Sequence, residues 1–438
     1  MIKIKKRLLL IIQQFWLSFE FFGKNGLANH AAAGAYGFLL SSAPVLLVIS
    51  FFITNILLRS PELAIGMFEQ INFLSEFLNP GEFLQDFLGS ANPGFAGIIS
   101  LIPVFWATRL CAQSMQRGLG VIFPEKKIQS DQNSVSRQRS TSIFGPFRGA
   151  VVTFGLGFLI ITFIFVMLLG STLALDFFGA MDFPLAASLY SIIYVLSAGD
   201  LSLAFLFLLV LVSYRFVPVN HPKWKNVIPG ALTCMVFYVL FILIFSLIIS
   251  PDRYNLLYGA LGSLFLFLLN VYFFFYFFLF GASFIMVQGA SNALLFIRFR
   301  QHHNKDLSSK RKLLDNLFAS VPWPLEKYIS EFKEGDLVFA RGSMDREVYY
   351  VLTGKAGVYL DDECLQRIAF IEEKHFFGEL EFVVEEGRSA SIKAETDLLV
   401  IVLPRVLYRQ ILQIDPDTDR SIIQGLSERL KSSNMRVL

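Results

Sequence analysis

Residues 376–391 read Phe-Phe-Gly-Glu-Leu-Glu-Phe-Val-Val-Glu-Glu-Gly-Arg-Ser-Ala-Ser, and short apolar segments separated by turns surround this stretch. Glycines that supply turns divide the segments: Gly335, Gly342, Gly354 and Gly387. The predicted strands are 336–340, 348–352, 357–360, 392–394 and 398–403. Helical spacing precedes them at 307–318 and returns at 404–436. The chain from residue 325 onward is therefore predicted to be a soluble β domain with flanking helices.

The glycine framework of this region resembles that of cyclic-nucleotide-binding domains. The resemblance rests on Glu334-Gly-Asp-Leu-Val-Phe339, on Gly342 and on Tyr350-Val-Leu-Thr-Gly354. Phe376-Phe-Gly-Glu-Leu380, with Arg388-Ser-Ala-Ser391 beginning nine residues after the glutamate, looks like the phosphate-binding cassette of that family. The resemblance implies a cytoplasmic β-roll, or jelly-roll, that binds cAMP or cGMP.

The resemblance also implies a role for individual residues. Arg388 would make a charge-assisted contact with the cyclic phosphate, and the amides of a short helix beginning near Gly378 would bind its oxygens. Glu379 would accept a hydrogen bond from the ribose 2′-hydroxyl. The expected nucleotide-binding residues are Gly378, Glu379, Leu380, Arg388, Ser389, Ala390, Ser433 and Asn434.

The sequence leaves two questions open: which base the ligand carries, and whether the domain binds a nucleotide at all. Ser433 and Asn434 match the positions from which cAMP-receptor-type regulators reach the base, which favours cAMP. The Arg388-Ser389 pair suits cAMP and cGMP equally. The alternative to binding is a module that keeps the fold only, but such relatives usually lack the glutamate or the arginine.

The chain before residue 298 has the composition of a membrane protein. Of the whole sequence 54% is hydrophobic, 17% is charged, and 48 residues are Phe. A membrane-spanning helix needs about 20 mostly apolar residues. Six windows meet this requirement: 35–57, 94–115, 149–172, 185–217, 227–250 and 260–287. We therefore predict an α-helical polytopic membrane bundle of six transmembrane helices.

The distribution of basic residues predicts the orientation of this bundle. Lys and Arg recur at the N-terminus, in the loops after the second and fourth windows and after the sixth, whereas the alternate flanks hold only Arg59 and Arg253. Both termini are therefore expected in the cytoplasm, on the inner face of a bacterial inner membrane. Residues 1–30 begin with basic and then apolar residues, and we expect an amphipathic helix on the cytoplasmic membrane surface.

Several motifs in the apolar part resemble the YihY/BrkB membrane family, over about residues 10–300. They are His30-Ala-Ala-Ala-Gly-Ala-Tyr-Gly-Phe-Leu-Leu-Ser-Ser-Ala-Pro44, the stretch from Val217-Pro-Val-Asn220 through Asn226-Val-Ile-Pro-Gly-Ala-Leu232, which resembles the family's loop into helix five, Tyr258-Gly-Ala-Leu-Gly-Ser263, Asn270-Val-Tyr272 and Leu279-Phe-Gly-Ala-Ser283. Gly37 and Ala43 depart from the usual pattern. The family was formerly mislabelled ribonuclease BN, and the resemblance implies a protein that moves lipid or another envelope component.

Polar residues inside the apolar windows are candidates for a membrane site, because they are costly in lipid. They are Arg109, Asp200 and Asn270. The alternative is that Arg109 extends to the inner interface and Asp200 lies at the outer one. In either case, the predicted divisions are 1–30, the membrane domain at 31–297, a connector at 298–324 and the nucleotide-binding domain at 325–438.

The remaining features argue against other classes of protein. A net charge of +3 gives no reason to expect a nucleic-acid partner, and the three cysteines show neither metal nor disulfide spacing. The five histidines form no metal cluster, so we expect no enzyme, no catalytic residue and no metal. We predict a cyclic-nucleotide-regulated transporter in contact with the lipid bilayer; the alternative is a membrane-anchored sensor or scaffold. The number of copies stays open, although domains of this type often pair through the C-terminal helix.

Overall fold

The computed structural model describes residues 2–52, 113–124, 201–218, 221–248, 260–304, 316–360, 367–379 and 387–415. The chain divides into two compact units. One unit is formed by residues 18–286, and the other by residues 1–17 together with 287–438. The predicted divisions fell at 30/31, 297/298 and 324/325, whereas the structure groups 1–17 and 287–304 with the C-terminal domain.

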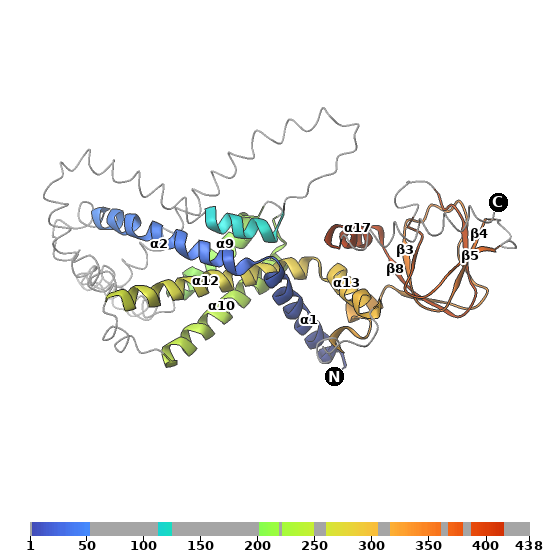
Figure 1. The fold of residues 1–438 in the computed structure, drawn as a ribbon, viewed down its shortest axis with the longest axis horizontal. Coiled ribbons are helices and arrows are strands. Elements are labelled where there is room, and N and C mark those ends of the chain that lie inside the picture. Colours follow the sequence, from blue (N-terminus) through green and yellow to red (C-terminus); the bar gives the residue numbers. More distant parts are fainter. Residues whose placement is uncertain are drawn as a thin grey trace, which may run out of the picture. The chain divides into compact units, whose positions relative to one another are not determined.

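The first unit is helical. Its described elements are the C-terminal part of α1 (Ile2–Lys24), α2 (Leu27–Phe52), a helix at 113–122, α9 (Leu201–Phe216), α10 (Trp224–Ile248) and α12 (Ala260–Gly289) (Figure 1). Trp224–Phe245 and Leu264–Gly289 are long and apolar enough to cross a membrane, and Leu203–Phe216 is a shorter apolar helix. Much of the predicted second window and all of the third lie outside the described residues.

Glycines let the neighbouring helices approach α12 closely. A Cβ on Gly281 of α12 would lie 2.7 Å from the carbonyl oxygen of Gly230 on α10. A Cβ on Gly34 of α2 would lie 2.7 Å from the ring of Phe275, and one on Gly118 would lie 2.8 Å from Leu279. Small residues at such crossings favour helix association in lipid. Gly281 is therefore a close packing position between α12 and α10.

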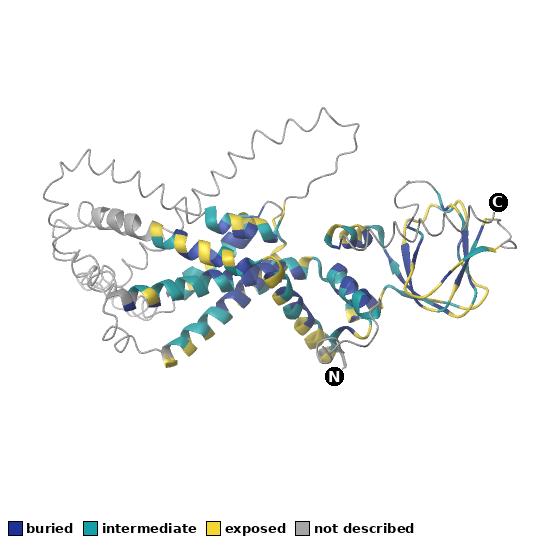
Figure 2. Cartoon of the chain, in the orientation of Figure 1, coloured by how far each residue is buried: buried dark blue, intermediate teal, exposed yellow. Residues whose placement is uncertain are grey.

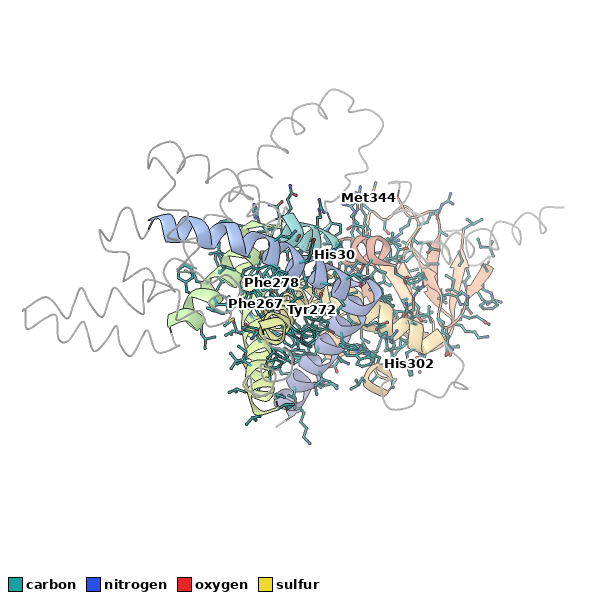
Figure 3. The ribbon with its side chains drawn as sticks, turned by 60° about the vertical axis from the view of Figure 1, so that its left-hand side comes forward. His30, Phe267, Tyr272, Phe278, His302 and Met344 are labelled. Carbon is teal, nitrogen blue, oxygen red and sulfur yellow. The ribbon has the colours of Figure 1, made fainter. Side chains whose placement is uncertain are left out.

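Aromatic residues fill the rest of the α10–α12 contact. Phe241 stacks on Phe273 with ring centroids 4.3 Å apart, and Phe237 stacks on Phe277 at 5.9 Å. Figure 3 labels Phe267, Tyr272 and Phe278, which belong to the aromatic residues of α12. These contacts position α10 along α12 over several turns.

The start of α10 lies inside the stretch 217–232 that resembles the family's loop into helix five. The helix begins at Trp224 and contains Pro229. A proline inside a helix removes one backbone hydrogen bond. The rest of α10 retains its backbone bonds, and Thr233 Oγ1 donates to the carbonyl of Pro229 at 2.8 Å. The predicted helix at 307–318 is described only at its end, as the 3₁₀ turn η3 (Asn316–Phe318).

The second unit contains two four-stranded antiparallel sheets. The first sheet has the order β1 (Ile329–Phe332), β8 (Leu398–Leu403), β3 (Val348–Thr353) and β6 (Phe376–Phe377). The second has the order β2 (Leu337–Phe339), β7 (Ser391–Ala394), β4 (Ala356–Tyr359) and β5 (Arg367–Ile371). The five predicted strands are confirmed as β2, β3, β4, β7 and β8, whereas β1, β5 and β6 were not predicted.

The first sheet is covered on both faces. Its inner face packs on the second sheet through a core that includes Tyr349, Val351 and Phe377. Its outer face is covered by α13 (Ser291–Asn304) and α17 (Arg405–Ile414), since Phe296 contacts Tyr350 at 5.4 Å between ring centroids (Figure 1). This explains the continuous apolar sequence of β3, in which all residues but the last are buried.

Candidate functional site

The site lies where β6 and β7 bring the two parts of the opening stretch together. β6 pairs with β3 through Tyr349–Phe377 and Tyr350–Phe376, and Gly378 and Glu379 follow it directly. Arg388 lies three residues before the start of β7. The fold therefore brings Gly378, Glu379 and Arg388 to one end of the β-roll, as the sequence predicted.

Arg388 is the central residue of this site. Its side chain is buried, with 2% of the residue exposed. Nη1 donates to the carbonyl of Gly378 at 3.0 Å, and Nη2 donates to the carbonyl of Glu347 at 2.7 Å. Its backbone is also fixed, because its N–H donates to Ser343 and its carbonyl accepts from the N–H of Gly342. The guanidinium is thus held in one position before any ligand is considered.

Aromatic rings form the floor beneath this guanidinium. Its Cζ lies 4.1 Å from the ring centroid of Phe339 and 5.9 Å from that of Tyr349. Tyr349 in turn stacks on Phe377, with 4.9 Å between ring centroids and 6° between ring planes. Burial is the largest cause that raises the pKa of Tyr349, so its phenol stays neutral. A cation over such rings is stabilised by their negative faces.

Gly378 is required at its position for two reasons. Its φ of +76° is a conformation that side chains rarely adopt. A Cβ there would lie 2.6 Å from Nη1 of Arg388 and 3.1 Å from the carbonyl oxygen of Glu347. The absence of a side chain at Gly378 thus makes room for the guanidinium of Arg388.

The other predicted nucleotide-binding residues differ in burial, and some lie outside the described residues. Glu379 is buried, Ser389 is exposed and Ala390 is half-buried. Leu380, Ser433 and Asn434 lie outside the described residues.

The structure adds residues that the sequence did not indicate. Phe339 and Tyr349 form the floor, and the hydroxyl of Ser391 accepts from the N–H of Arg341 at 2.9 Å. The Oγ of Ser343, on the turn that holds Arg388, is buried and has no hydrogen-bond partner within the described part of the chain. A fixed buried cation fits a small anion such as a cyclic phosphate. Only the strand pattern around Phe339 could have indicated this floor in advance.

The predicted membrane site is described only at Asn270. Its Oδ1 accepts a hydrogen bond of 2.9 Å from the hydroxyl of Tyr238, which joins α12 to α10. Arg109 and Asp200 lie outside the described residues, so the grouping of the three residues in one membrane site stays a prediction.

Fold and site together define a class: a protein with apolar membrane-type helices followed by a β-roll that holds a buried arginine for an anionic ligand. The family described as Virulence factor BrkB matches residues 18–294, which is more than half of the chain. A cyclic nucleotide-binding domain matches residues 329–415. The chain therefore belongs to the BrkB family and carries a cyclic nucleotide-binding domain after the BrkB region. Both family resemblances and the order of the two regions are confirmed.

Curated relatives match the nucleotide-binding part. The cAMP-activated global transcriptional regulator CRP of Pasteurella multocida is 26% identical over 114 residues, which are 25% of this chain and 54% of that protein. A putative potassium channel protein of Rhodopseudomonas palustris is 29% identical over 99 residues, which are 23% of this chain and 24% of that protein. This chain thus spans about half the length of the regulator and about a quarter of the channel.

Solved structures give matches of similar extent. A Thermus thermophilus catabolite activator protein is 23% identical, with a TM-score of 0.23, and the match covers 25% of this chain and 54% of that one. The cAMP-bound EAL enzyme Bd1971 is 19% identical, with a TM-score of 0.20, and the match covers 25% of this chain and 29% of that one.

Proposed function

We propose that this chain is a cyclic-nucleotide-regulated inner-membrane protein that moves lipid or another envelope component. The observation that supports nucleotide binding best is the buried guanidinium of Arg388, which is fixed by the carbonyls of Gly378 and Glu347 over the ring of Phe339. A prearranged cation binds an anion with little loss of conformational freedom. The BrkB family match supports the membrane part of the proposal.

The ligand that we propose is cAMP. The curated regulators that match this domain are named as cAMP-activated, and the sequence resemblance near Ser433 and Asn434 favours the same base. Glu379 would distinguish a ribose from a 2′-deoxyribose by accepting from the 2′-hydroxyl. Replacing cAMP by 2′-deoxy-cAMP is therefore expected to weaken binding about tenfold, the usual scale for one hydrogen bond to a charged group.

We further propose six membrane spans with both termini in the cytoplasm. The polarity of α1 supports a membrane surface near the N-terminus (Figure 2). Its polar residues Gln13 and Ser18 are buried, whereas Leu8 and Phe19 are each 58% exposed. The helix also buries Leu17 and Phe22, but its exposed apolar side chains suit contact with lipid better than contact with water.

In this proposal the protein binds and switches, and it is not an enzyme. Nucleotide can drive a switch only if it binds one conformation more tightly than another. Pairing of copies through the C-terminal helix would be one way to transmit such a preference.

The test is lipid translocation by the purified full chain in proteoliposomes, with a fluorescent headgroup-labelled phospholipid as the probe. We expect cAMP to change the translocation rate of the wild type and to have no effect on Arg388→Leu. A translocation rate that is the same with and without cAMP would contradict the regulatory part of the proposal. Nucleotide binding without any translocation would contradict the transport part and would favour the sensor or scaffold.

A further inference from the structure

A buried ion pair joins the two helices on the outer face of the first sheet. Nη2 of Arg300, on α13, lies 3.0 Å from Oδ2 of Asp415, the residue that caps the C-terminal end of α17. Their side chains are only 8% and 9% exposed. Burying two charges costs desolvation, which is offset only when their geometry is good. Such a pair therefore specifies one relative position of α13 and α17.

The same two helices hold the ring of Phe376. The Cζ of Arg300 lies 5.7 Å from the ring centroid, and the rings of Phe296 on α13 and Tyr408 on α17 each lie 6.1 Å from it. The ring of Tyr350, on β3, lies 5.0 Å away. Phe376 is thus enclosed by aromatic side chains and a cation from three elements.

Phe376 belongs to β6, a strand of two residues that can form few backbone hydrogen bonds. β6 contains two residues and lies at the end of its sheet, where it pairs only with β3. Its second residue, Phe377, lies on the opposite face, stacked on Tyr349 beneath the guanidinium of Arg388. Val351 of β3 also makes backbone hydrogen bonds to residues 374 and 375, and the enclosure of Phe376 adds side-chain contacts that fix where β6 lies.

The residue after β6 links the position of this strand to the pocket. Gly378 follows Phe377 directly, and its carbonyl accepts the 3.0 Å hydrogen bond from Arg388. A shift of Phe376 would therefore move a carbonyl that fixes the guanidinium, together with the adjacent Glu379.

We infer that Arg300 and Asp415 are positioning residues for the nucleotide pocket, and that they act through Phe376 and β6. Binding of nucleotide and the seating of α13 on the β-roll are consequently linked. The linkage is reciprocal, so anything that displaces α13 also weakens nucleotide binding. Since α13 begins two residues after the end of α12, this helix is one segment that can couple the pocket to the helical unit. The inference rests on the proposed nucleotide binding and specifies how that site is regulated.

The first test is a cAMP titration of the full chain in lipid nanodiscs by isothermal calorimetry. Arg300→Met and Asp415→Asn are each expected to weaken binding about tenfold. Arg300→Lys keeps the charge and is expected to recover part of the affinity. Lys355→Met serves as the matched control, because Lys355 forms an exposed ion pair with Glu372 on the same domain, and it is expected to bind cAMP as the wild type does.

Two further variants keep the test decisive if a single charge left in the interior prevents folding. Arg300→Met combined with Asp415→Leu replaces the pair by apolar side chains, which proteins often tolerate well. Phe376→Leu keeps an apolar residue but removes the ring. Both are expected to fold and to bind cAMP about tenfold more weakly.

Hydrogen exchange provides a readout that a purely structural pair would not change. In the wild type, cAMP is expected to slow amide exchange over residues 291–304, and the effect is expected to disappear in Phe376→Leu. The inference would be overturned if the folded variants bound cAMP with wild-type affinity. It would also be overturned if cAMP did not change amide exchange in α13. A wild type that binds no cAMP would instead overturn the proposed function.

Discussion

In the helical unit the buried hydroxyls of Tyr214 and Ser283 donate to backbone carbonyls of α12, whereas the second unit buries the charge of Arg388 in the β-roll and those of Arg300 and Asp415 on its helices. The buried polar side chains in the described part of residues 18–286 are uncharged. The bond from Tyr214 joins α9 to α12 through a neutral group, whereas the bond from Ser283 lies within α12; in lipid a charge would be costly. Fixed charges suit recognition of an anion. The comparison therefore assigns packing to the described helices and ligand chemistry to the β-roll.

The largest expected effect concerns the close helix crossing. In Gly281→Val the new side chain would meet the carbonyl of Gly230 at 2.7 Å, so we expect a loss of at least about 3 kcal/mol of stability. Thermal unfolding of the detergent-solubilised chain measures it. Gly120→Val is the matched control, because a Cβ at Gly120 meets nothing within 4 Å. Equal stability of the two variants would show that the crossing does not hold the unit together.

The next effect concerns the pocket glycine. Gly378→Ala places a methyl group 2.6 Å from Nη1 of Arg388, so we expect cAMP affinity to fall about 10- to 100-fold, or about 1.4–2.7 kcal/mol. Gly335→Ala has the same kind of backbone penalty, with φ of +91°, but a Cβ there meets nothing within 4 Å. Calorimetric titration should show normal affinity for this control. Weakening in both variants would attribute the effect to general destabilisation.

A smaller effect is expected for the polar pair in the membrane helices. Tyr238→Phe removes the hydrogen bond to Asn270 and should cost about 0.6 kcal/mol, the average for such bonds between membrane helices. Unfolding in detergent and lipid translocation are measured together. If translocation falls severely while stability hardly changes, Asn270 takes part in a transport site. The described helices would then do more than pack against one another.

The smallest effect is a pH dependence in the β-roll. Above all the hydrogen bond from Tyr359, and also Arg367 at 3.0 Å, lower the pKa of Glu395. A lowered pKa gives stability that is present above the carboxyl's ordinary range and is lost as the pH falls through the folded-state value. Because the group is partly exposed, we expect less than about 1 kcal/mol.

Thermal unfolding of the wild type and Glu395→Gln between pH 7 and pH 3 measures this effect. The melting temperature of the wild type should fall more steeply with acid than that of the variant. Glu372→Gln, which removes an exposed pairing with Lys355, is the control for loss of one carboxylate. Parallel curves for the wild type and Glu395→Gln would contradict the expectation.

Local patterns in the sequence predicted much of this structure. The apolar windows gave the described membrane helices, and the spacing of Gly378, Glu379 and Arg388 predicted their meeting in the fold. β6 escaped prediction because two residues carry no periodicity. The pairing of Arg300 with Asp415 joins residues 115 positions apart, and no local pattern encodes such a contact. The buried side chain of Gln13 donates a hydrogen bond to the carbonyl of Leu317, which is even more distant in sequence, at 304 positions.

The measurement that tests the central claim most directly is a cAMP titration of the full chain and of Arg388→Leu in nanodiscs. Loss of one buried charge-assisted contact, together with the carbonyls that it orders, should reduce affinity at least about 100-fold. Saturable binding by the wild type and none by the variant at the same concentrations is the predicted result. Equal affinity of the two proteins would contradict the assignment of Arg388 as the anion-binding residue.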